Sequence, residues 1–110
     1  MIAKKVFAAG ASLALAAGLA MAQSKEKGDS GKGKEIFEQC GVCHNADSEE
    51  KKMGPGLKGL FKKEKLSDGK KVTEATVRTK VNEGGNGMPA YQEMLTDEER
   101  DHLIAYLKTL

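Results

Sequence analysis

Two cysteines and a histidine stand close together near residue 40, in the order Cys40, Cys43 and His44. Two thiols separated by two residues can face the same way from one helical turn, so each can add to one of the two vinyl groups on an edge of a haem. The imidazole of His44 can then lie under the iron as an axial ligand. The spacing therefore predicts one covalently attached haem c with a built-in iron ligand.

Three other uses of these residues are weaker. A redox-active dithiol needs the cysteine pair at the start of a helix in a βαβ setting, and no β-branched run precedes Cys40. A zinc site needs four ligands, and the adjacent residues Cys43 and His44 are poorly placed to chelate one ion with the distant His102. A structural disulfide would leave His44 without a role.

A second axial ligand decides what such a haem could do, because a haem with one protein ligand binds gases or peroxide and a haem with two transfers electrons. The candidates are Met53, Met88, Met94 and His102. Gly87 lets the backbone approach the ring, and Pro89 stiffens the loop after Met88. A methionine is more often a core residue, but beside this motif we expect Met88 to be the metal ligand.

The other candidates are less suitable. Met94 directly precedes a predicted helix cap, and His102 is expected to be a solvated or hydrogen-bonded helix residue. The carbonyl of Pro55 is suited to accept the proton on the far nitrogen of His44 and so to fix the imidazole tautomer. Met53 lies two residues before Pro55, so it is expected on the His44 side of the haem, which is the wrong face for a second ligand. The alternative for Pro55 is an ordinary Pro-Gly turn.

Helices are predicted to position these residues, and no segment has the alternation of a strand. Residues 30–40 form a first helix, in which Gly33, Ile36, Phe37 and Cys40 share one face. A glycine in this helix either allows close crossing by a second helix or reflects a flexible helix end. Crossing is the favoured interpretation.

Two further helices have clear ends. Thr73 is a predicted N-cap, with Val72 placed to pack on Val77, and Gly84 and Gly85 end that helix. The last helix covers residues 97–110. It begins with a capping box of Thr96 and Glu99, and its apolar stripe is formed by Leu103, Tyr106, Leu107 and Leu110. Between the helices we expect a polar loop at 45–52, a short helical turn at 57–61, a basic loop at 62–71 and a loop at 86–91.

The N-terminal residues indicate export. Residues 1–22 have two lysines, an apolar stretch and an A-x-A sequence before Gln23, as in a cleaved signal peptide. The apolar stretch is shorter than the roughly 20 residues of a membrane span, so an uncleaved membrane anchor is the less favoured alternative. We expect a flexible polar N-terminus at 23–30, one domain at 31–110, and a periplasmic location.

Charge is unevenly distributed along the exported part of the chain. Its formal net charge is zero, but residues 51–80 carry +7, residues 23–50 carry −3 and residues 81–110 carry −4. Such asymmetry affects docking and association rates. The lysines of residues 51–80 either favour an acidic partner face or form an ordinary solvated surface.

Five short motifs follow one another along residues 31–110. They are Gly33-x-x-x-Phe37, Cys40-x-x-Cys43-His44, Gly54-Pro55-Gly56-Leu57, Gly87-Met88-Pro89 and Leu103-x-x-Tyr106. In this order they resemble the landmarks of class I monohaem cytochromes c. Two departures are Gly56, where many relatives have Asn, and the absence of Trp, which some relatives use near a haem propionate. Arg78 and Lys70 are candidates for that propionate contact.

The resemblance implies an all-α cytochrome c fold, with three to five short helices wrapped around one covalently bound haem. Gly33 and Phe37 would meet Leu103 and Tyr106 where the first and last helices cross. Around the haem, bonded through Cys40 and Cys43, the implied contacts come from Pro55 on the His44 side, from Leu57, and from Met88 as the distal iron ligand.

We therefore expect a monomeric periplasmic electron-transfer protein with a low-spin His/Met haem c, and not an enzyme. Its partners would be redox proteins that bind transiently through an acidic docking face of their own, with no nucleic acid and no small-molecule substrate. Two alternatives are a haem subunit of a larger oxidoreductase, and a haem enzyme or sensor with a displaceable methionine ligand.

Overall fold

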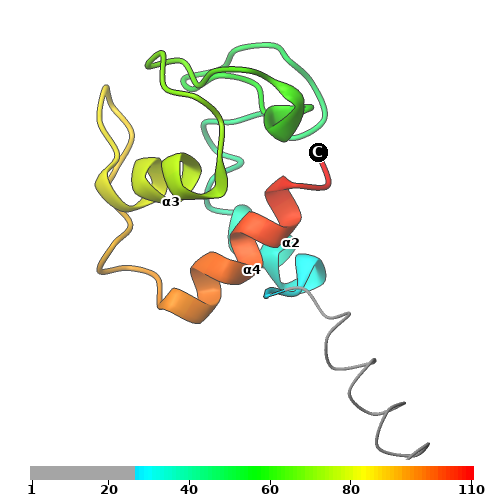
Figure 1. Cartoon of the computed structure of the whole chain (residues 1–110), viewed down its shortest axis with the longest axis vertical. Coiled ribbons are helices and arrows are strands. Elements are labelled where there is room, and N and C mark those ends of the chain that lie inside the picture. Colours follow the sequence, from blue (N-terminus) through cyan, green and yellow to red (C-terminus); the bar gives the residue numbers. More distant parts are fainter. Residues whose placement is uncertain (1–26) are drawn as a thin grey trace, which may run out of the picture.

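The computed structural model describes residues 27–110. Its elements are the α-helices α2 (Ser30–Phe37), α3 (Glu74–Glu83) and α4 (Asp97–Leu107) and the 3-10 helix η1 (Leu60–Lys62) (Figure 1). The only β-type pairs in this range are isolated bridges, Lys65 with Lys71 and Gly85 with Met88. The all-α prediction is confirmed. The predicted signal peptide at 1–22 lies outside the described residues, and within them no helix is long and apolar enough to span a membrane.

Helices α2 and α4 cross at Gly33. A Cβ built on Gly33 would lie 1.9 Å from the carbonyl oxygen of His102 and 2.7 Å from the Cβ of Tyr106, so only glycine fits at this crossing. Beside it, the rings of Phe37 and Tyr106 lie 5.3 Å apart between centroids, and Leu103 is fully buried. The predicted contact of the first and last helices is confirmed (Figure 1).

Helix α2 begins as predicted and ends early. The side chain of Asp29 caps it by accepting hydrogen bonds from the N–H groups of Gly31 and Lys32. The N–H of Asp29 itself donates to Nδ1 of His102, 2.9 Å away, so the last residues of the stretch expected to be flexible are attached to α4. The helix ends at Phe37 and not at residue 40, because the N–H of Cys40 turns back to the Phe37 carbonyl.

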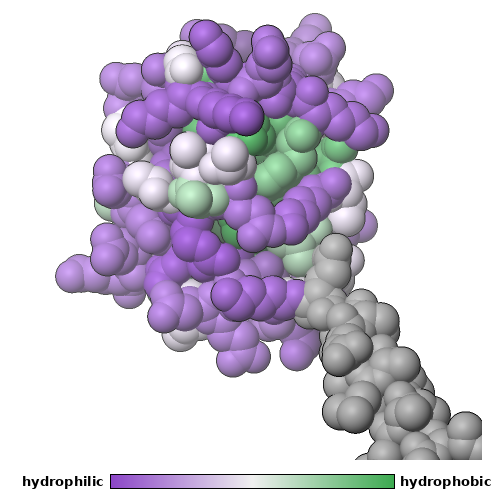
Figure 2. Space-filling view, in the orientation of Figure 1, coloured by the Kyte–Doolittle hydropathy of each residue, from purple (hydrophilic) through white to green (hydrophobic). Residues whose placement is uncertain are grey.

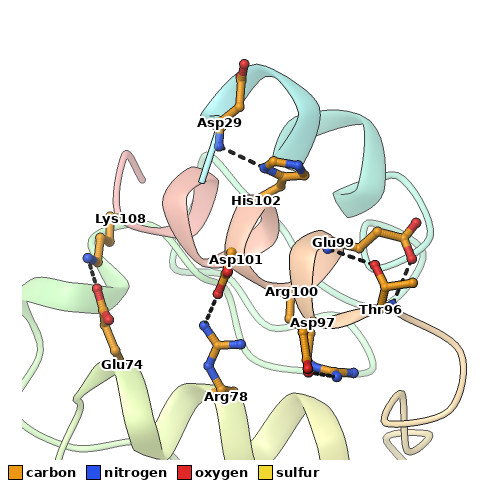
Figure 3. A network of polar contacts seen from close by, with 10 residues as sticks. All are labelled: Asp29, Glu74, Arg78, Thr96, Asp97, Glu99, Arg100, Asp101, His102 and Lys108. Atoms are coloured by element: carbon orange, nitrogen blue, oxygen red, sulfur yellow. Dashed lines mark hydrogen bonds and ion pairs between the residues drawn. The ribbon is translucent and has the colours of Figure 1, made fainter. Parts of the chain in front are cut away.

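The ends of α3 and α4 follow local chemistry. Thr73 caps α3, and Gly84, with a φ of 65°, ends it. The capping box of Thr96 and Glu99 begins α4 as predicted (Figure 3). The last helix stops at Leu107, so the final residues of the predicted range are outside it.

The core is small, and its buried residues come mainly from α2, η1, α3 and α4, with α4 in contact with both α2 and α3. The helical turn expected at 57–61 is present as η1, shifted toward the C-terminus by one to three residues. Polar residues cover most of the face shown in Figure 2, with apolar residues between them near its centre. The larger buried apolar residues of the described chain are Phe37, Leu60, Val77, Val81, Leu95, Leu103, Ile104 and Leu107.

Candidate haem site

The segment with the two cysteines follows α2 as further helical turns. The N–H groups of Cys43 and His44 both donate to the carbonyl of Cys40, at 3.1 and 3.0 Å. Cys40 is half-buried against the core, whereas Val42 is 72% exposed. This local geometry is the single-turn arrangement that the motif predicts for two thiols that react with one planar group.

The environment of Cys40 argues against a redox-active dithiol. Burial raises the pKa of the Cys40 thiol, and the neighbouring Cys43 raises it further. Thiols that exchange disulfides have a lowered pKa, because the thiolate is the attacking species. The Cys40 thiol is therefore poorly suited to disulfide exchange.

His44 is oriented by the two residues Gly54 and Pro55. Its Nδ1 lies 2.8 Å from the carbonyl oxygen of Pro55. A carbonyl can only accept, so Nδ1 carries the proton and Nε2 keeps the lone pair that binds a metal. A Cβ on Gly54 would lie 2.5 Å from Cε1 of the ring, so glycine leaves the space that the imidazole fills.

Met88 closes a tight turn directly after α3. Gly85 and Met88 exchange backbone hydrogen bonds of 2.9 and 3.1 Å. The two residues between them, Asn86 and Gly87, have positive φ angles of 52° and 91°, as a type I′ turn requires. The loop predicted at 86–91 is present, and Met88 is half-buried against the core.

The chain after Met88 folds back onto the last turn of α3. The N–H of Tyr91 donates to the carbonyl of Val81 at 2.9 Å, and the N–H of Gln92 donates to that of Asn82 at 3.2 Å. Burial raises the pKa of Tyr91, and the Cys40 and Cys43 thiols are the next causes. Tyr91 and Cys40 both pack against the hydrophobic core, so the chain after Met88 and the cysteine segment border the same core.

The other ligand candidates are placed differently. Met53 and Met94 are 80% and 61% exposed. In His102 the Nδ1 accepts from the Asp29 N–H, and Nε2 lies 3.7 Å from Glu98, so this histidine is a hydrogen-bonded helix residue as expected (Figure 3). Within residues 27–110 no group of three or more His, Cys, Asp or Glu side chains is arranged to hold a metal ion.

The donor set fits a haem. Two neighbouring thiols, one imidazole with a fixed tautomer and one half-buried thioether are the groups needed for two covalent bonds and two axial ligands. Leu57 is half-buried against the core, and its N–H donates to the carbonyl of Asn45 just after His44. It can therefore supply apolar surface next to the attachment segment.

The propionate candidates have different surroundings. The Nη2 of Arg78 lies 2.5 Å from the carboxylate of Asp101, so this guanidinium joins α3 to α4 (Figure 3). Lys70 is exposed, and its N–H donates to the side chain of Asp68 within the stretch 62–71, where a basic loop is predicted. These positions do not support Arg78 or Lys70 as a contact of a haem propionate.

Two features of the site region are missing from the sequence-based prediction. One is the type I′ turn, for which Asn86-Gly87 is a strong signal. The other is Arg100, which is buried in α4. The sequence contains a signal for it. Arg100 precedes the buried residues Leu103, Ile104 and Leu107 by three, four and seven positions, so a charge lies on the apolar face of the helix.

Comparisons with known proteins point to one family. A family model described as Cytochrome c matches residues 30–110. A solved structure of cytochrome c6 from the diatom Phaeodactylum tricornutum matches with a TM-score of 0.58 and 32% sequence identity, and the match covers 74% of this chain and 93% of that chain. No curated protein sequence matches the chain significantly.

Proposed function

The chain belongs to the cytochrome c family, whose members carry covalently bound haem c, and on that basis we propose that it is a periplasmic carrier of single electrons between redox proteins. The observation that carries the proposal is the His44 ring. The Pro55 carbonyl accepts a hydrogen bond from Nδ1 of this ring, so Nε2 remains available to bind iron. When bound, the haem supplies a one-electron couple between ferric and ferrous iron.

Cys40 and Cys43 are the proposed attachment residues. Each S–H would add across one vinyl group, with the sulfur bonded to one vinyl carbon and the hydrogen to the other. Their spacing by one helical turn supports this role. Attachment also removes two thiols that would otherwise be open to oxidation in an exported protein.

His44 and Met88 are the proposed axial ligands. The hydrogen bond to Pro55 fixes the tautomer of the His44 imidazole and holds its orientation. The thioether of Met88 is a soft ligand that favours ferrous iron, so the pair raises the reduction potential. With both ligands in place, no position would remain at the iron for a substrate, which supports a carrier and not an enzyme.

The surface beside Cys43 is the proposed site of electron exchange. Val42 and Met53 are among the most exposed large apolar side chains of the described residues, and the Met53 sulfur lies 3.9 Å from the Cys43 sulfur. The ammonium of Lys52 is held 3.0 Å from the carbonyl of Gly41. An apolar spot with lysine beside it suits brief contact with an acidic partner.

The compartment and the assembly are part of the proposal. The signal-like residues 1–22 support export to the periplasm. We also propose that the protein is a monomer that meets its partners transiently. The contact of Leu57 with the haem is proposed from its position next to the attachment segment.

An optical spectrum combined with a redox titration of the purified holoprotein tests the function. A carrier shows the weak red-edge absorption of ferric iron bound to methionine sulfur, slow binding of cyanide, and one reversible one-electron step. Absence of the red-edge band at neutral pH together with rapid cyanide or carbon monoxide binding would identify a haem enzyme or sensor instead. Purification in fixed stoichiometry with another protein would identify a subunit.

A further inference from the structure

Arg100 is the one charged side chain of residues 27–110 that is buried, with 7% of its surface exposed. It lies in the first turns of α4, on the apolar stripe. A buried guanidinium is costly unless its N–H groups are bonded, so its partners explain why it is there.

The partners of Arg100 are mainly backbone carbonyls. Its Nη1 donates to the carbonyl of Leu95 at 2.7 Å and to that of Gln92 at 3.1 Å. Its Nη2 donates to the carboxylate of Asp97, whose side chain is 95% exposed (Figure 3). The carboxylate is therefore in water, and the carbonyls are the partners that fix the buried end.

Both carbonyls belong to the segment that joins Met88 to α4. Gln92 is bonded on both sides, because its N–H donates to Asn82 at the end of α3 and its carbonyl accepts from Arg100 in α4. The N–H of Leu95 donates to the carbonyl of Tyr91. Arg100 thus ties the chain that follows Met88 to the last helix.

We propose that Arg100 is a positioning residue that keeps the sulfur of Met88 on the iron. This inference rests on the proposed ligation by Met88. Departure of the sulfur requires the loop to move, and movement of its C-terminal half breaks the bonds that Arg100 makes to Gln92 and Leu95. Residues around a metal ligand act in this way when their hydrogen bonds restrict the positions that the ligand can adopt.

The test uses the ferric holoprotein and measures the cyanide binding rate at neutral pH, together with the pH at which the red-edge band disappears. In Arg100→Met the two carbonyls lose their donor. We expect cyanide binding about tenfold faster than in the wild type, with loss of the band at lower pH. Arg100→Lys keeps a charge and one or two donors, so its cyanide binding rate should lie between those of the wild type and Arg100→Met. It replaces Arg100→Met in the test if that variant does not fold.

Two control variants separate this role from general stability. Asp97→Asn removes the exposed ion partner and leaves the carbonyl bonds, and Ile104→Val loosens the core on the same helix without removing a donor to Gln92 or Leu95. Both should bind cyanide within about twofold of the wild-type rate. The inference is overturned if both Arg100 variants bind cyanide at the wild-type rate, or if Ile104→Val accelerates binding as much as they do.

Failure of the ligand assignment has a different signature. If the wild-type protein lacks the red-edge band, or if Met88→Ala leaves the band in place, then Met88 is not the ligand and the role of Arg100 falls with it. A wild-type band that Met88→Ala removes and the Arg100 variants leave unchanged contradicts the role of Arg100 alone.

Discussion

The carbonyl oxygen of Pro55 lies 2.8 Å from Nδ1 of His44, on the chain segment that also supplies the glycine against the imidazole ring. One hydrogen bond and one steric contact from adjacent residues thus determine both the tautomer and the orientation of His44. The ring has little freedom left before any metal is bound.

Gly54→Ala should displace the His44 ring. The new Cβ would lie 2.5 Å from Cε1, so we expect the free energy of unfolding of the holoprotein to fall by about 1–3 kcal/mol. Gly41→Ala is the matched control inside the attachment motif, because its Cβ meets nothing closer than 3.4 Å. Denaturant unfolding compares the two. Equal stability of the two variants would show that the ring does not depend on Gly54.

Gly33→Ala should separate α2 from α4. Its Cβ would lie 1.9 Å from a backbone carbonyl oxygen, which cannot move aside as a side chain can, and we expect a loss of about 3 kcal/mol or failure to fold. Gly31→Ala in the same helix meets only the Asp29 side chain at 3.2 Å and gains helix propensity. Denaturant unfolding should therefore leave Gly31→Ala close to the wild type. A Gly33→Ala protein of wild-type stability would contradict the close crossing.

The contrast between these glycines shows what the sequence could predict. The helix crossing at Gly33 could be predicted, because a glycine that weakens a helix on its apolar face is explained by a closely packed partner helix. The capping box at Thr96 could be predicted because caps depend on a few adjacent residues. The ends of α2 and α4 were placed too late. The turns after Phe37 and Leu107 depend on backbone bonds that neither residue type nor periodicity reports.

Protonation of the Asp29 carboxylate should lower the stability of the protein in acid. Hydrogen bonds from the N–H groups of Lys32 and Gly31 lower the pKa of Asp29 below its ordinary value. The stabilisation by this carboxylate is present above the ordinary pKa and is lost as the pH falls through the lowered one. Asp29→Asn keeps a capping side chain without the charge.

The pH dependence of the free energy of unfolding checks this cap. Between about pH 5 and pH 2, wild-type stability should fall more steeply than that of Asp29→Asn, and the two should be close near neutral pH. Parallel curves over the whole range would mean that the Asp29 carboxylate does not contribute. His102, whose ring faces Asp29, is the same in both proteins.

Lysines beside the attachment segment should speed reaction with an anionic oxidant. Removing two exposed charges in Lys51→Gln/Lys52→Gln should lower the second-order rate constant for oxidation of the reduced protein by ferricyanide about twofold to fivefold at low ionic strength. The difference should vanish in high salt, because salt screens the attraction.

The double variant Lys32→Gln/Lys34→Gln is the control for net charge. It removes two exposed lysines from α2, so it changes the total charge equally and the charge near Cys43 less. Stopped-flow oxidation should leave its rate closer to the wild type. Equal slowing of both double variants would show that total charge alone steers the reaction.

The site was predictable to the extent that its chemistry lies in short strings. Cys40 and His44 form part of one motif, and Pro55 could be linked to His44 because a proline carbonyl remains free to accept. Arg100 was not predicted, because its partners are backbone carbonyls and any residue type can supply those. A charge on an apolar stripe was visible in the sequence, but its purpose depends on the loop that packs beside it.

The measurement that tests the central claim most directly is the visible spectrum and midpoint potential of Met88→Ala holoprotein, with Met53→Ala and Met94→Ala as controls. If Met88 ligates the iron, its removal abolishes the red-edge band and lowers the midpoint potential, because the soft sulfur that favours ferrous iron is gone. The exposed Met94 should leave both unchanged, and Met53→Ala should keep the band although the Met53 sulfur lies 3.9 Å from that of Cys43. A Met88→Ala protein with the wild-type band and midpoint would contradict the assignment, and with it the proposed carrier function.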